Sequence, residues 1–320
     1  MAVFGSGHGI STLIPAALST DLYDIYVANS RFQKGTKNSQ AITGVQEESR
    51  EVLFQNFDID LAVIAVPPYE QLELARILVN NAKNIYIEKP AGINSFEAKQ
   101  LEVLAKEYNC NMFVGYQFRF DPGIQYWKKL ILNSASVGKV SINWQTTGNN
   151  GKNNVFNWRN FPSKGGGVRT NFLVHVIDYL FYIFGQDQIN NLSQWVVLEN
   201  NLNSISVLCV GSIEIEINIS RGTVKNSYWE VGLYNSKDEI FIRHSAPFTN
   251  FDYKSNDNHF LKTLSKTQIA TDVRIQSTAI LFAAIGLTIN QGAKNPSDLP
   301  NIHDSLMVHN LIEGIFNSTA

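Results

Sequence analysis

The sequence predicts an α/β protein: a doubly wound parallel sheet followed by an α+β domain with a large, mostly antiparallel open sheet. Strand and helix patterns alternate through the first third of the chain, which is typical of a parallel sheet covered by helices on both faces. Beyond residue 190, strand-like runs follow one another without helices between them, which favours antiparallel pairing. The chain has 320 residues, which suits about two domains. We predict their bounds as 1–120 and 121–320.

The first domain opens on a strand almost at the first residue. Met1 to Phe4 is an apolar run that ends in Gly5, and further short apolar runs follow. The predicted strands lie at 1–4, 23–28, 61–66, 84–87 and 112–115. Between the last two, Asn94 and Glu97 form a capping pair ahead of leucines at helical spacing, so a crossover helix is expected to begin there.

The second domain begins with a helix after Asp121 and continues with a glycine-rich loop and an apolar helix over 165–185. Strands are predicted at 194–199, 205–210, 212–220, 228–234 and 239–243, and helices at 272–291 and 304–318. In the third of these strands, isoleucines alternate with polar residues from Ile213 to Ile219, which is typical of a sheet with one wet face. We expect helices or a second copy of the chain to cover the isoleucines, and predict a homodimer or homotetramer formed through this sheet.

Charge and composition exclude several classes of function. Lysine and arginine number 26 against 28 acidic residues, so the chain lacks the excess of cations that binding to nucleic-acid phosphates needs. The two cysteines are too few for a disulfide framework or a metal cluster. The longest apolar runs are too short to cross a bilayer, and no leader pattern precedes the first strand. We expect a cytoplasmic protein with a small-molecule ligand, and no metal, nucleic acid or membrane.

A glycine loop joins the first predicted strand to a helix pattern. Gly5, Gly7 and Gly9 stand in Gly-Ser-Gly-His-Gly-Ile, and such glycines let the backbone turn tightly and approach a pyrophosphate at a helix N-terminus. The spacing differs from the usual Gly-x-Gly-x-x-Gly, because Ile10 holds the third place. A tight turn without a ligand would use the same residues, but the position after the first strand of a doubly wound sheet favours a dinucleotide.

The residues at the end of the second predicted strand indicate which dinucleotide the site binds. A site selective for NAD usually has an acidic residue there for the ribose hydroxyls, whereas this chain has Ser30, Arg31 and Lys34. These side chains suit a 2′-phosphate, unless Arg31 is only a solvated loop cation. The sequence therefore favours NADP and leaves NAD open.

Two groups of polar residues carry the candidate chemistry. Lys89 follows the strand 84–87, at the edge where open α/β sheets bind ligands. A lysine there can hold or relay the proton of a hydroxyl; a surface lysine is the alternative. Asn171, His175 and Asp178 share one face of an apolar helix behind a glycine triplet. Polar groups on such a helix need partners or a cavity, which favours a site over a satisfied core histidine.

Together these motifs resemble the glucose–fructose oxidoreductase, inositol dehydrogenase and MocA (Gfo/Idh/MocA) family of NAD(P)-dependent oxidoreductases. The motifs are the glycine loop, Ala65-Val66-Pro67-Pro68, Glu88-Lys89-Pro90, Gly115-Tyr116-Gln117-Phe118-Arg119-Phe120, and Trp158-Arg159 ahead of the segment 165–178. They cover nearly the whole chain in the right order. The resemblance implies a Rossmann domain, a second domain whose open sheet builds dimers or tetramers, and a final helix that packs back towards the first domain.

The resemblance also implies roles for single residues. Lys89 matches the family's active-site lysine, His175 matches its acid/base histidine, and the Lys89–Pro90 bond is often cis in relatives. We predict Lys89, His175 and Asn171 as catalytic. The predicted cofactor contacts are Gly5, Gly7, His8, Gly9, Ile10, Ser30, Arg31, Lys34, Val66, Pro67, Pro68, Tyr69, Glu88, Lys89 and Gln117. The predicted substrate contacts are Lys89, Tyr116, Arg119, Arg159, Asn171 and His175.

Two positions depart from the family pattern. Asn171 stands where the family usually has an aspartate, and Leu173 where a glycine is common. An amide can hydrogen-bond a substrate hydroxyl, but it cannot accept a proton or support an imidazolium as a charge would. Leu173 would narrow the pocket.

We therefore expect an oxidoreductase that moves a hydride between nicotinamide and a carbinol or keto carbon of a sugar, nucleotide sugar or cyclitol. The alternative is a sensor or regulatory protein that binds NADP and a sugar without turnover. Asn171 favours the sensor, whereas Lys89 and His175 favour the enzyme. A third interpretation is an imine or enone reductase on the same scaffold. Arg119, Arg159 and Arg169 are available for an anionic group on the substrate or for structural ion pairs.

Overall fold

The computed structural model describes residues 1–5, 7–28, 45–132, 137–147, 157–192, 194–222, 227–234, 239–245, 250–254, 273–292 and 298–317. The chain divides into two compact units. Unit 1 consists of Met1–Gln117 and Ile275–His309, and unit 2 of Phe118–Arg274 and Asn310–Ala320. The bounds predicted from the sequence assign residues 275–309 to the second domain, whereas the structure places them in unit 1.

Unit 1 is built on a six-stranded parallel sheet with the strand order β3-β2-β1-β4-β5-β6. This confirms the doubly wound sheet that the sequence predicts. The strands are β1 (Ala2–Phe4), β2 (Ile25–Ala28), β3 (Val45–Glu48), β4 (Ala62–Ile64), β5 (Asn84–Ile87) and β6 (Asn111–Val114). The order reverses between β1 and β4, and the crevice at such a reversal is where open α/β sheets bind ligands.

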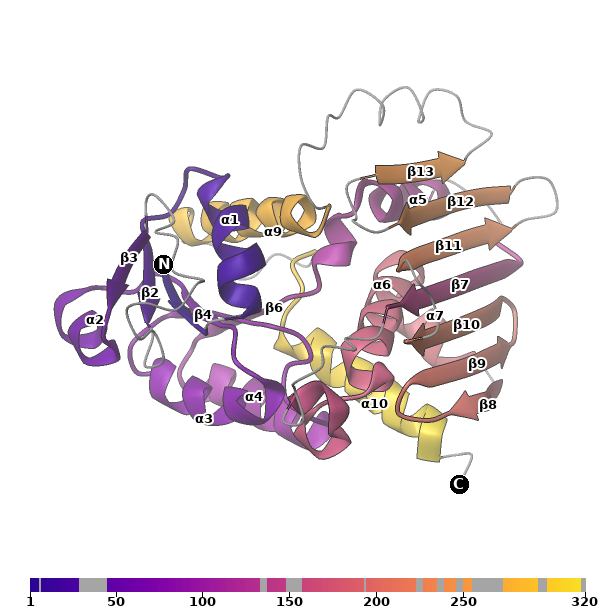
Figure 1. The fold of residues 1–320 in the computed structure, drawn as a ribbon, viewed down its shortest axis with the longest axis horizontal. Coiled ribbons are helices and arrows are strands. Elements are labelled where there is room, and N and C mark those ends of the chain that lie inside the picture. The colour runs from indigo at the N-terminus through magenta and orange to yellow at the C-terminus, as the bar shows by residue number, and fades with distance from the viewer. Residues whose placement is uncertain are drawn as a thin grey trace. The chain divides into compact units, whose positions relative to one another are not determined.

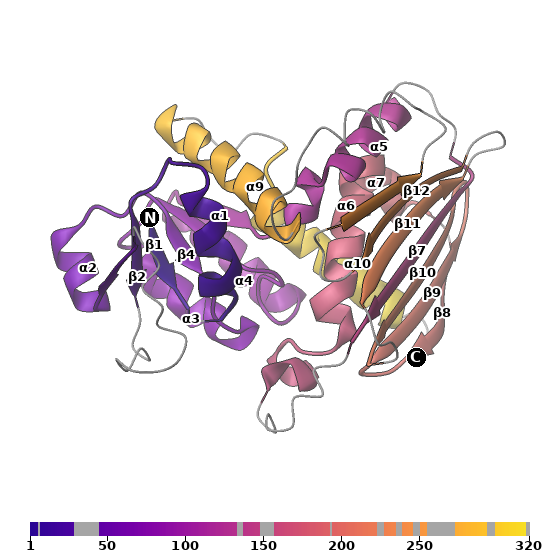
Figure 2. The same ribbon diagram turned by 45° about the horizontal axis from the view of Figure 1, so that its top comes forward.

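Helices lie on both faces of this sheet (Figures 1 and 2), so β1, β4 and β5 are buried throughout. They are α1 (Ile14–Leu18), α2 (Arg50–Asn56), α3 (Pro68–Leu78), α4 (Ser95–Glu107) and α9 (Val273–Asn290). Helix α4 begins at the predicted capping pair. Asn94 Oδ1 accepts from the Glu97 N–H at 3.0 Å, and Glu97 Oε2 accepts from the Ile93 N–H at 2.9 Å.

Helix α9 returns to unit 1 because it packs on aromatic side chains there. The Phe282 ring lies 5.0 Å from the Tyr86 ring and 6.2 Å from the Tyr23 ring. The Tyr23 hydroxyl donates to the Phe282 carbonyl at 2.6 Å. The last helix, α10 (Ile302–Asn317), begins in unit 1 and ends in unit 2. Across the described residues, no helix combines the length and apolarity that a bilayer crossing needs.

Unit 2 holds a seven-stranded, mostly antiparallel sheet in the order β13-β12-β11-β7-β10-β9-β8 (Figure 1), as the sequence predicts. Its strands are β7 (Lys139–Thr146), β8 (Gln194–Asn200), β9 (Ser204–Val210), β10 (Glu214–Arg221), β11 (Tyr228–Tyr234), β12 (Glu239–Ser245) and β13 (Asn250–Lys254). β7 and β13 are not among the predicted strands. β7 pairs in parallel with β10 at the centre, so the sheet is mixed. Its helices are α5 (Pro122–Leu132), α6 (Val174–Phe184) and α7 (Gln186–Asn190).

The isoleucine face of β10 is buried inside the single chain. Ile215 and Ile217 are 0% exposed and Ile219 is 1% exposed. Figure 2 shows α5, α6 and α7 along one side of the sheet, and the Tyr179 ring of α6 lies 5.8 Å from the Trp229 ring of β11. Helices of the same chain therefore cover this face, which is the first of the two expected arrangements, and the homodimer or homotetramer stays a prediction.

Candidate active site

Three glycines after β1 form the predicted pyrophosphate loop, and each has different surroundings. Gly5 has φ +140°, and a Cβ there would lie 2.3 Å from the carbonyl oxygen of Ala65. A Cβ on Gly9 would lie 3.1 Å from Ala65 Cβ and 3.3 Å from Val3 Cγ1. Around Gly7, none of the described atoms lies within 4 Å of an added Cβ. The fold therefore requires glycine at 5 and packs tightly around Gly9, whereas Gly7 leaves open space in which a ligand can approach the backbone.

Gly9 also explains the departure from the usual glycine spacing. It opens the π-helical turn η1 (Gly9–Leu13), which contains Ile10 and continues into α1. Gly9 thus fills the role of the third glycine, which is close packing of the helix on the strands. The predicted 2′-phosphate contacts Ser30, Arg31 and Lys34 lie outside the described residues, so the preference for NADP stays a prediction.

The loop after β4 carries the second group of predicted cofactor contacts. Helix α3 begins at Pro68, where proline suits the first helical position because an N–H there would have no helical partner. Val66 and Pro67 are half-buried, and Tyr69 is exposed. These residues lie at the carboxyl end of β4, next to the point where the strand order reverses.

Glu88 and Lys89 follow β5 at the same edge of the sheet. Lys89 is half-buried, and its bond to Pro90 is cis, as the resemblance implies. Glu88 is buried, and its Oε1 accepts from the Tyr86 hydroxyl at 2.7 Å and lies 3.8 Å from Nε2 of His8. Burial, together with the Glu88 charge, holds the pKa of the Tyr86 phenol well above its usual value, so the hydroxyl stays a donor. Glu88 thus joins the glycine loop to the strand end that carries the predicted catalytic lysine.

Two residues that the sequence does not assign to the site support this strand end. Gln71 of α3 is 1% exposed; its Nε2 donates to the Glu88 carbonyl at 2.7 Å, and its Oε1 accepts from the Gly92 N–H at 2.8 Å. It therefore fixes the backbone on both sides of the lysine. A Cβ on Gly115 would lie 2.6 Å from the Tyr86 hydroxyl and 2.8 Å from Glu88 Oε1, so glycine there makes room for this hydrogen bond.

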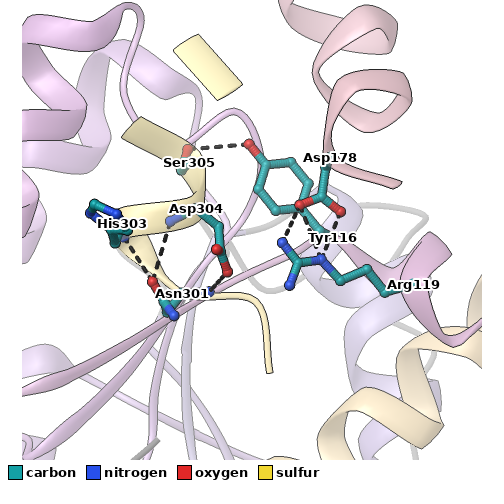
Figure 3. A network of polar contacts seen from close by, with 7 residues as sticks. All are labelled: Tyr116, Arg119, Asp178, Asn301, His303, Asp304 and Ser305. Atoms are coloured by element: carbon teal, nitrogen blue, oxygen red, sulfur yellow. Dashed lines mark hydrogen bonds and ion pairs between the residues drawn. The ribbon is translucent and has the colours of Figure 1, made fainter. Parts of the chain in front are cut away.

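Tyr116 and Gln117 follow β6 and differ in their surroundings. Tyr116 is 0% exposed, and its hydroxyl lies 3.2 Å from Ser305 Oγ (Figure 3). It is engaged in the core of unit 1, where it anchors α10. Gln117 is buried, and its Oε1 has no hydrogen-bond partner among the described residues. A buried acceptor left without a donor costs free energy, so this oxygen fits a donor on a ligand. The open space at Gly7 and the Gln117 oxygen both fit a bound dinucleotide.

In unit 2, the predicted catalytic helix follows the glycine triplet. A Cβ on Gly166 would lie 2.4 Å from the Trp158 carbonyl oxygen, and Gly167 has φ +90°. A π-helical turn, η5 (Arg169–Leu173), then leads into α6. Asn171 is buried, and its Nδ2 donates to the Gly167 carbonyl at 2.7 Å. The amide nitrogen therefore holds the glycine loop, and Oδ1 is the atom that can accept a hydrogen bond from a hydroxyl.

His175 lies one turn further along α6, within a group of aromatic rings. It is 3% exposed, and its ring centroid lies 4.7 Å from that of Phe118, edge to face, and 5.9 Å from that of Trp144. Trp144 also contacts Phe172, at 5.0 Å. These rings fix the direction of the imidazole and shield it from bulk water, as a positioned acid or base requires.

Asp178 and Arg119 form a buried ion pair (Figure 3). Arg119 Nε lies 3.1 and 3.0 Å from the two carboxylate oxygens, and Nη2 lies 2.6 Å from Oδ1. The two side chains are 5% and 1% exposed. Arg119, predicted from the sequence as a substrate contact, instead has its charge neutralised within unit 2. Arg169 is likewise engaged: its guanidinium lies 3.5 Å over the Phe316 ring, and its Nε donates to Asn200 Oδ1 at 3.1 Å.

The predicted site residues thus fall into two groups. The glycine loop, the start of α3, Glu88, Lys89 and Gln117 lie in unit 1, and Arg159, Asn171 and His175 lie in unit 2. Arg159 is exposed on the turn η3 (Trp158–Asn160), where its guanidinium lies 4.6 Å over the Trp158 ring.

Comparison with known proteins adds family matches to this geometry. Residues 1–116 match a family model described as "Oxidoreductase family, NAD-binding Rossmann fold", and residues 128–194 match one described as "Oxidoreductase family, C-terminal alpha/beta domain". An uncharacterised oxidoreductase of Synechocystis sp. is 28% identical over 195 residues, which is 59% of this chain and 52% of that protein. An oxidoreductase of Formosa agariphila is 29% identical over 210 residues, 63% of this chain and 62% of that protein. The matches therefore span about half to three fifths of these relatives' lengths.

Solved structures share the fold over nearly the whole chain. Levoglucosan dehydrogenase in complex with NADH and levoglucosan has a TM-score of 0.77 at 16% identity, covering 99% of this chain and 96% of that one. The transcriptional regulator Gal80p of Kluyveromyces lactis has a TM-score of 0.74 at 16% identity, and the match covers 99% of this chain and 91% of that one. KijD10, a 3-ketoreductase of Actinomadura kijaniata in complex with NADP, has a TM-score of 0.72 at 12% identity, and the match covers 99% of this chain and 97% of that one. At such identities the likeness concerns the fold alone.

Proposed function

The chain belongs to the Gfo/Idh/MocA oxidoreductase family, and from this we propose that it is an NADP-dependent oxidoreductase acting on a carbinol or keto carbon of a sugar, nucleotide sugar or cyclitol. The observation that carries the proposal is a buried, ring-packed His175 one turn after Asn171, in a chain whose glycine loop leaves open space at Gly7. The family's NAD-binding fold and its sugar dehydrogenase neighbours support the same conclusion.

The proposed mechanism divides the proton and the hydride between different groups. The nicotinamide, when bound, supplies or accepts the hydride. In oxidation, His175 takes the proton of the reacting hydroxyl, and the Lys89 ammonium stabilises the oxygen as negative charge develops on it. Asn171 orients the hydroxyl through Oδ1, because its Nδ2 is bonded to the Gly167 carbonyl. In reduction, the same groups return the proton.

The direct test is a fluorescence screen of NADPH and NADH oxidation against keto sugars and nucleotide sugars, with NADP⁺ and NAD⁺ reduction as the reverse assay. The proposal expects turnover of at least one carbohydrate, and loss of that turnover in the Lys89 and His175 variants described below. Turnover of imines or enones alone would instead assign the reductase function.

The alternative function is a sensor that binds NADP and a sugar without turnover. Asn171, where the family usually has an aspartate, favours it because an amide cannot accept a proton. The fold it shares with the transcriptional regulator Gal80p is compatible with such a role. Calorimetric binding of both ligands without any change in nicotinamide absorbance would favour the sensor over the enzyme.

Substitution at Gly7 is expected to separate ligand binding from folding. Gly7→Ala adds a methyl group where none of the described atoms lies within 4 Å, so its melting temperature stays at the wild-type value. The methyl would occupy space that we assign to the pyrophosphate, and NADPH binding weakens by about 10–100-fold. Gly5→Ala is the matched control, because its Cβ would meet the Ala65 carbonyl at 2.3 Å and the fold itself is destabilised. Unchanged NADPH affinity in Gly7→Ala would place the pyrophosphate elsewhere.

The preference for NADPH over NADH is expected to depend on Arg31. Ser30, Arg31 and Lys34 follow β2 without an acidic residue to bind the ribose hydroxyls of NAD. Arg31→Ala should weaken NADPH binding by about 10-fold or more through loss of a charge-assisted bond, and leave NADH binding unchanged. Fluorescence titration of both cofactors against both proteins measures this. An equal loss of affinity for NADPH and NADH would show that Arg31 does not bind the 2′-phosphate.

Asn171→Asp is expected to change both stability and pH dependence. The substitution removes the donor to the Gly167 carbonyl and sets two acceptors against each other, so the free energy of unfolding falls by about 1–2 kcal/mol. A carboxylate beside His175 favours the protonated imidazole, so the acid side of the pH–rate profile for oxidation moves to higher pH. Asn171→Ala is the control, because it loses the same donor without adding a charge. Wild-type stability in both variants would contradict the role of Nδ2.

A further inference from the structure

Lys89 lies in a segment that leaves the parallel sheet and leads to the next helix. This segment, called the Lys89 segment below, runs from Glu88 to Ile93 and joins β5 to α4. At its start, the Glu88 N–H donates to the Ile64 carbonyl of β4 at 2.9 Å. At its end, the Ile93 N–H donates to Glu97 Oε2 at 2.9 Å. The position of the Lys89 backbone therefore depends on what holds the segment between these two bonds.

One buried side chain of α3 holds the Lys89 segment at two points. Gln71 is 1% exposed. Its Nε2 donates to the Glu88 carbonyl at 2.7 Å, and its Oε1 accepts from the Gly92 N–H at 2.8 Å. Glu88 and Gly92 are themselves buried, and buried backbone groups need such partners. Both polar ends of one amide are therefore bonded to the backbone, one residue before Lys89 and three residues after it.

Close packing against α4 restricts the same segment. Gly92 has φ +78°, and a Cβ there would lie 2.8 Å from Glu97 Cβ and 3.1 Å from the backbone nitrogen of Ala98. The backbone at Gly92 thus lies against the first turn of α4 while its N–H is bonded to Gln71 of α3. The Lys89 segment is held between two helices, and Gln71 supplies the bonds from α3.

The helix that carries Gln71 begins at two of the predicted cofactor contacts. Pro68 is the first residue of α3, and Tyr69 follows it. Gln71 lies three residues after Pro68, which is about one helical turn. The helix that is predicted to contact the dinucleotide is therefore also the helix that holds the Lys89 segment.

We propose that Gln71 is a positioning residue for the proposed reaction: its bonds to Glu88 and Gly92 direct the Lys89 ammonium to the reacting hydroxyl. This inference rests on the proposed function, because that function gives Lys89 its role. Gln71 acts on the reaction through Lys89 and not through contact with the substrate. A displacement of about 1 Å can lower a rate by about 10²-fold, so loss of the two bonds should slow turnover although every reacting group is still present.

Two substitutions of matched design test this role. Gln71→Met keeps the approximate shape of the side chain and loses both hydrogen bonds. Asn84→Leu is the control, because Asn84 is a buried amide at the amino end of β5 and also uses both polar ends. Its Nδ2 donates to the Asp60 carbonyl at 2.8 Å, and its Oδ1 accepts from Asn111 Nδ2 at 2.8 Å. Both substitutions should lower the melting temperature, but only Gln71→Met should lower kcat, by about 10-fold or more, with NADPH binding close to wild type.

A double-mutant cycle shows whether Gln71 acts through Lys89. In a Lys89→Ala background, Gln71→Met should cause no further loss of kcat, because the group that it positions is absent. Asn84→Leu should have the same small effect in both backgrounds. An equal loss of kcat from Gln71→Met with and without Lys89 would assign Gln71 a purely structural role and overturn the inference.

Chemical labelling of Lys89 tests the inference without turnover. Acetic anhydride labels lysine side chains, and peptide mass spectrometry compares the half-buried Lys89 with the exposed Lys83 of the same protein. In Gln71→Met, the ratio of the Lys89 rate to the Lys83 rate should rise, because a released segment exposes the Lys89 side chain to the reagent. In Asn84→Leu, the ratio should equal that of wild type.

Gln71→Glu provides a second variant in case Gln71→Met does not fold. The glutamate keeps the length of the side chain and an acceptor for the Gly92 N–H, but its ionised form has no donor for the Glu88 carbonyl. The protonated carboxyl group can donate to that carbonyl, and burial favours the protonated form. The labelling ratio of this variant should therefore approach the wild-type ratio as the pH is lowered.

The outcomes separate this inference from the proposed function. If both Gln71 variants show the wild-type labelling ratio at every pH, the inference is overturned, and turnover of a carbohydrate by the wild type would leave the proposed function standing. A raised ratio in a protein that turns over no carbohydrate would confirm that Gln71 holds Lys89 in place and would refute the oxidoreductase.

Discussion

Replacing His175 or Lys89 with alanine is expected to slow turnover by at least about 10²-fold while NADPH binding stays close to wild type. A positioned acid or base contributes about 10²–10⁴-fold to a rate. His175 is buried against Phe118 and Trp144, so its replacement by alanine removes the proposed acid/base group from a fixed position. Lys89 follows β5 directly at the ligand-binding edge of the sheet. Steady-state kinetics on the substrate found in the screen, together with fluorescence titration of NADPH, measure both effects.

Two further variants make this test specific. His175→Gln retains much of the side-chain volume. It therefore distinguishes the effect of losing the proton-transfer group from the effect of the cavity that alanine would leave among the aromatic rings. Lys83→Ala removes an exposed lysine just before the amino end of the same strand, and its rate should equal that of wild type. If His175→Ala turns over at the wild-type rate, the assignment of the acid/base group is wrong.

Much of the fold could be predicted because its signals are local. The parallel strands are short apolar runs, and Asn94 with Glu97 marks the start of α4. By contrast, β3 is a short strand of Val-Gln-Glu-Glu without an apolar run. The strand β7 has a readable alternation of Val140, Ile142 and Trp144, but its parallel pairing with β10 depends on a partner about 75 residues away. The placement of α9 in unit 1 depends on ring contacts that no sequence pattern encodes.

In the candidate site, too, residues within sequence motifs could be predicted, whereas residues placed by tertiary contacts could not. Residues within motifs, such as Gly5 and Glu88, could be assigned to the site because the spacing of a motif indicates how the backbone turns at the end of a strand. Gln71 could not, because a glutamine on a helix gives no sign that both its polar ends bind the loop around Lys89, the predicted catalytic lysine. Arg119 was predicted to contact substrate because it stands within a family motif, whereas the pairing with Asp178 arises only when α6 packs on the segment after β6.

Breaking the Arg119–Asp178 pair is expected to have the largest effect on stability. Asp178→Asn removes the carboxylate that pairs with the Arg119 guanidinium, which is 5% exposed, and removal of one partner from a buried pair costs about 3–5 kcal/mol. All five tryptophans lie in unit 2, so their fluorescence during urea unfolding follows the unit that holds the pair. The rate should fall as well, because α6 carries both Asp178 and His175.

The control for this prediction is an exposed pair in the same unit. Glu214→Gln weakens the ion pair with Lys139, in which Lys139 is 40% exposed and Glu214 is 44% exposed, and should cost less than about 1 kcal/mol. The double variant Arg119→Met with Asp178→Leu removes both charges and should recover most of the stability lost in Asp178→Asn, because the desolvation cost disappears with them. If Asp178→Asn lowers the free energy of unfolding no more than Glu214→Gln does, the Arg119–Asp178 pair does not hold α6 in place. Asp178 would then be a candidate for a role in the site.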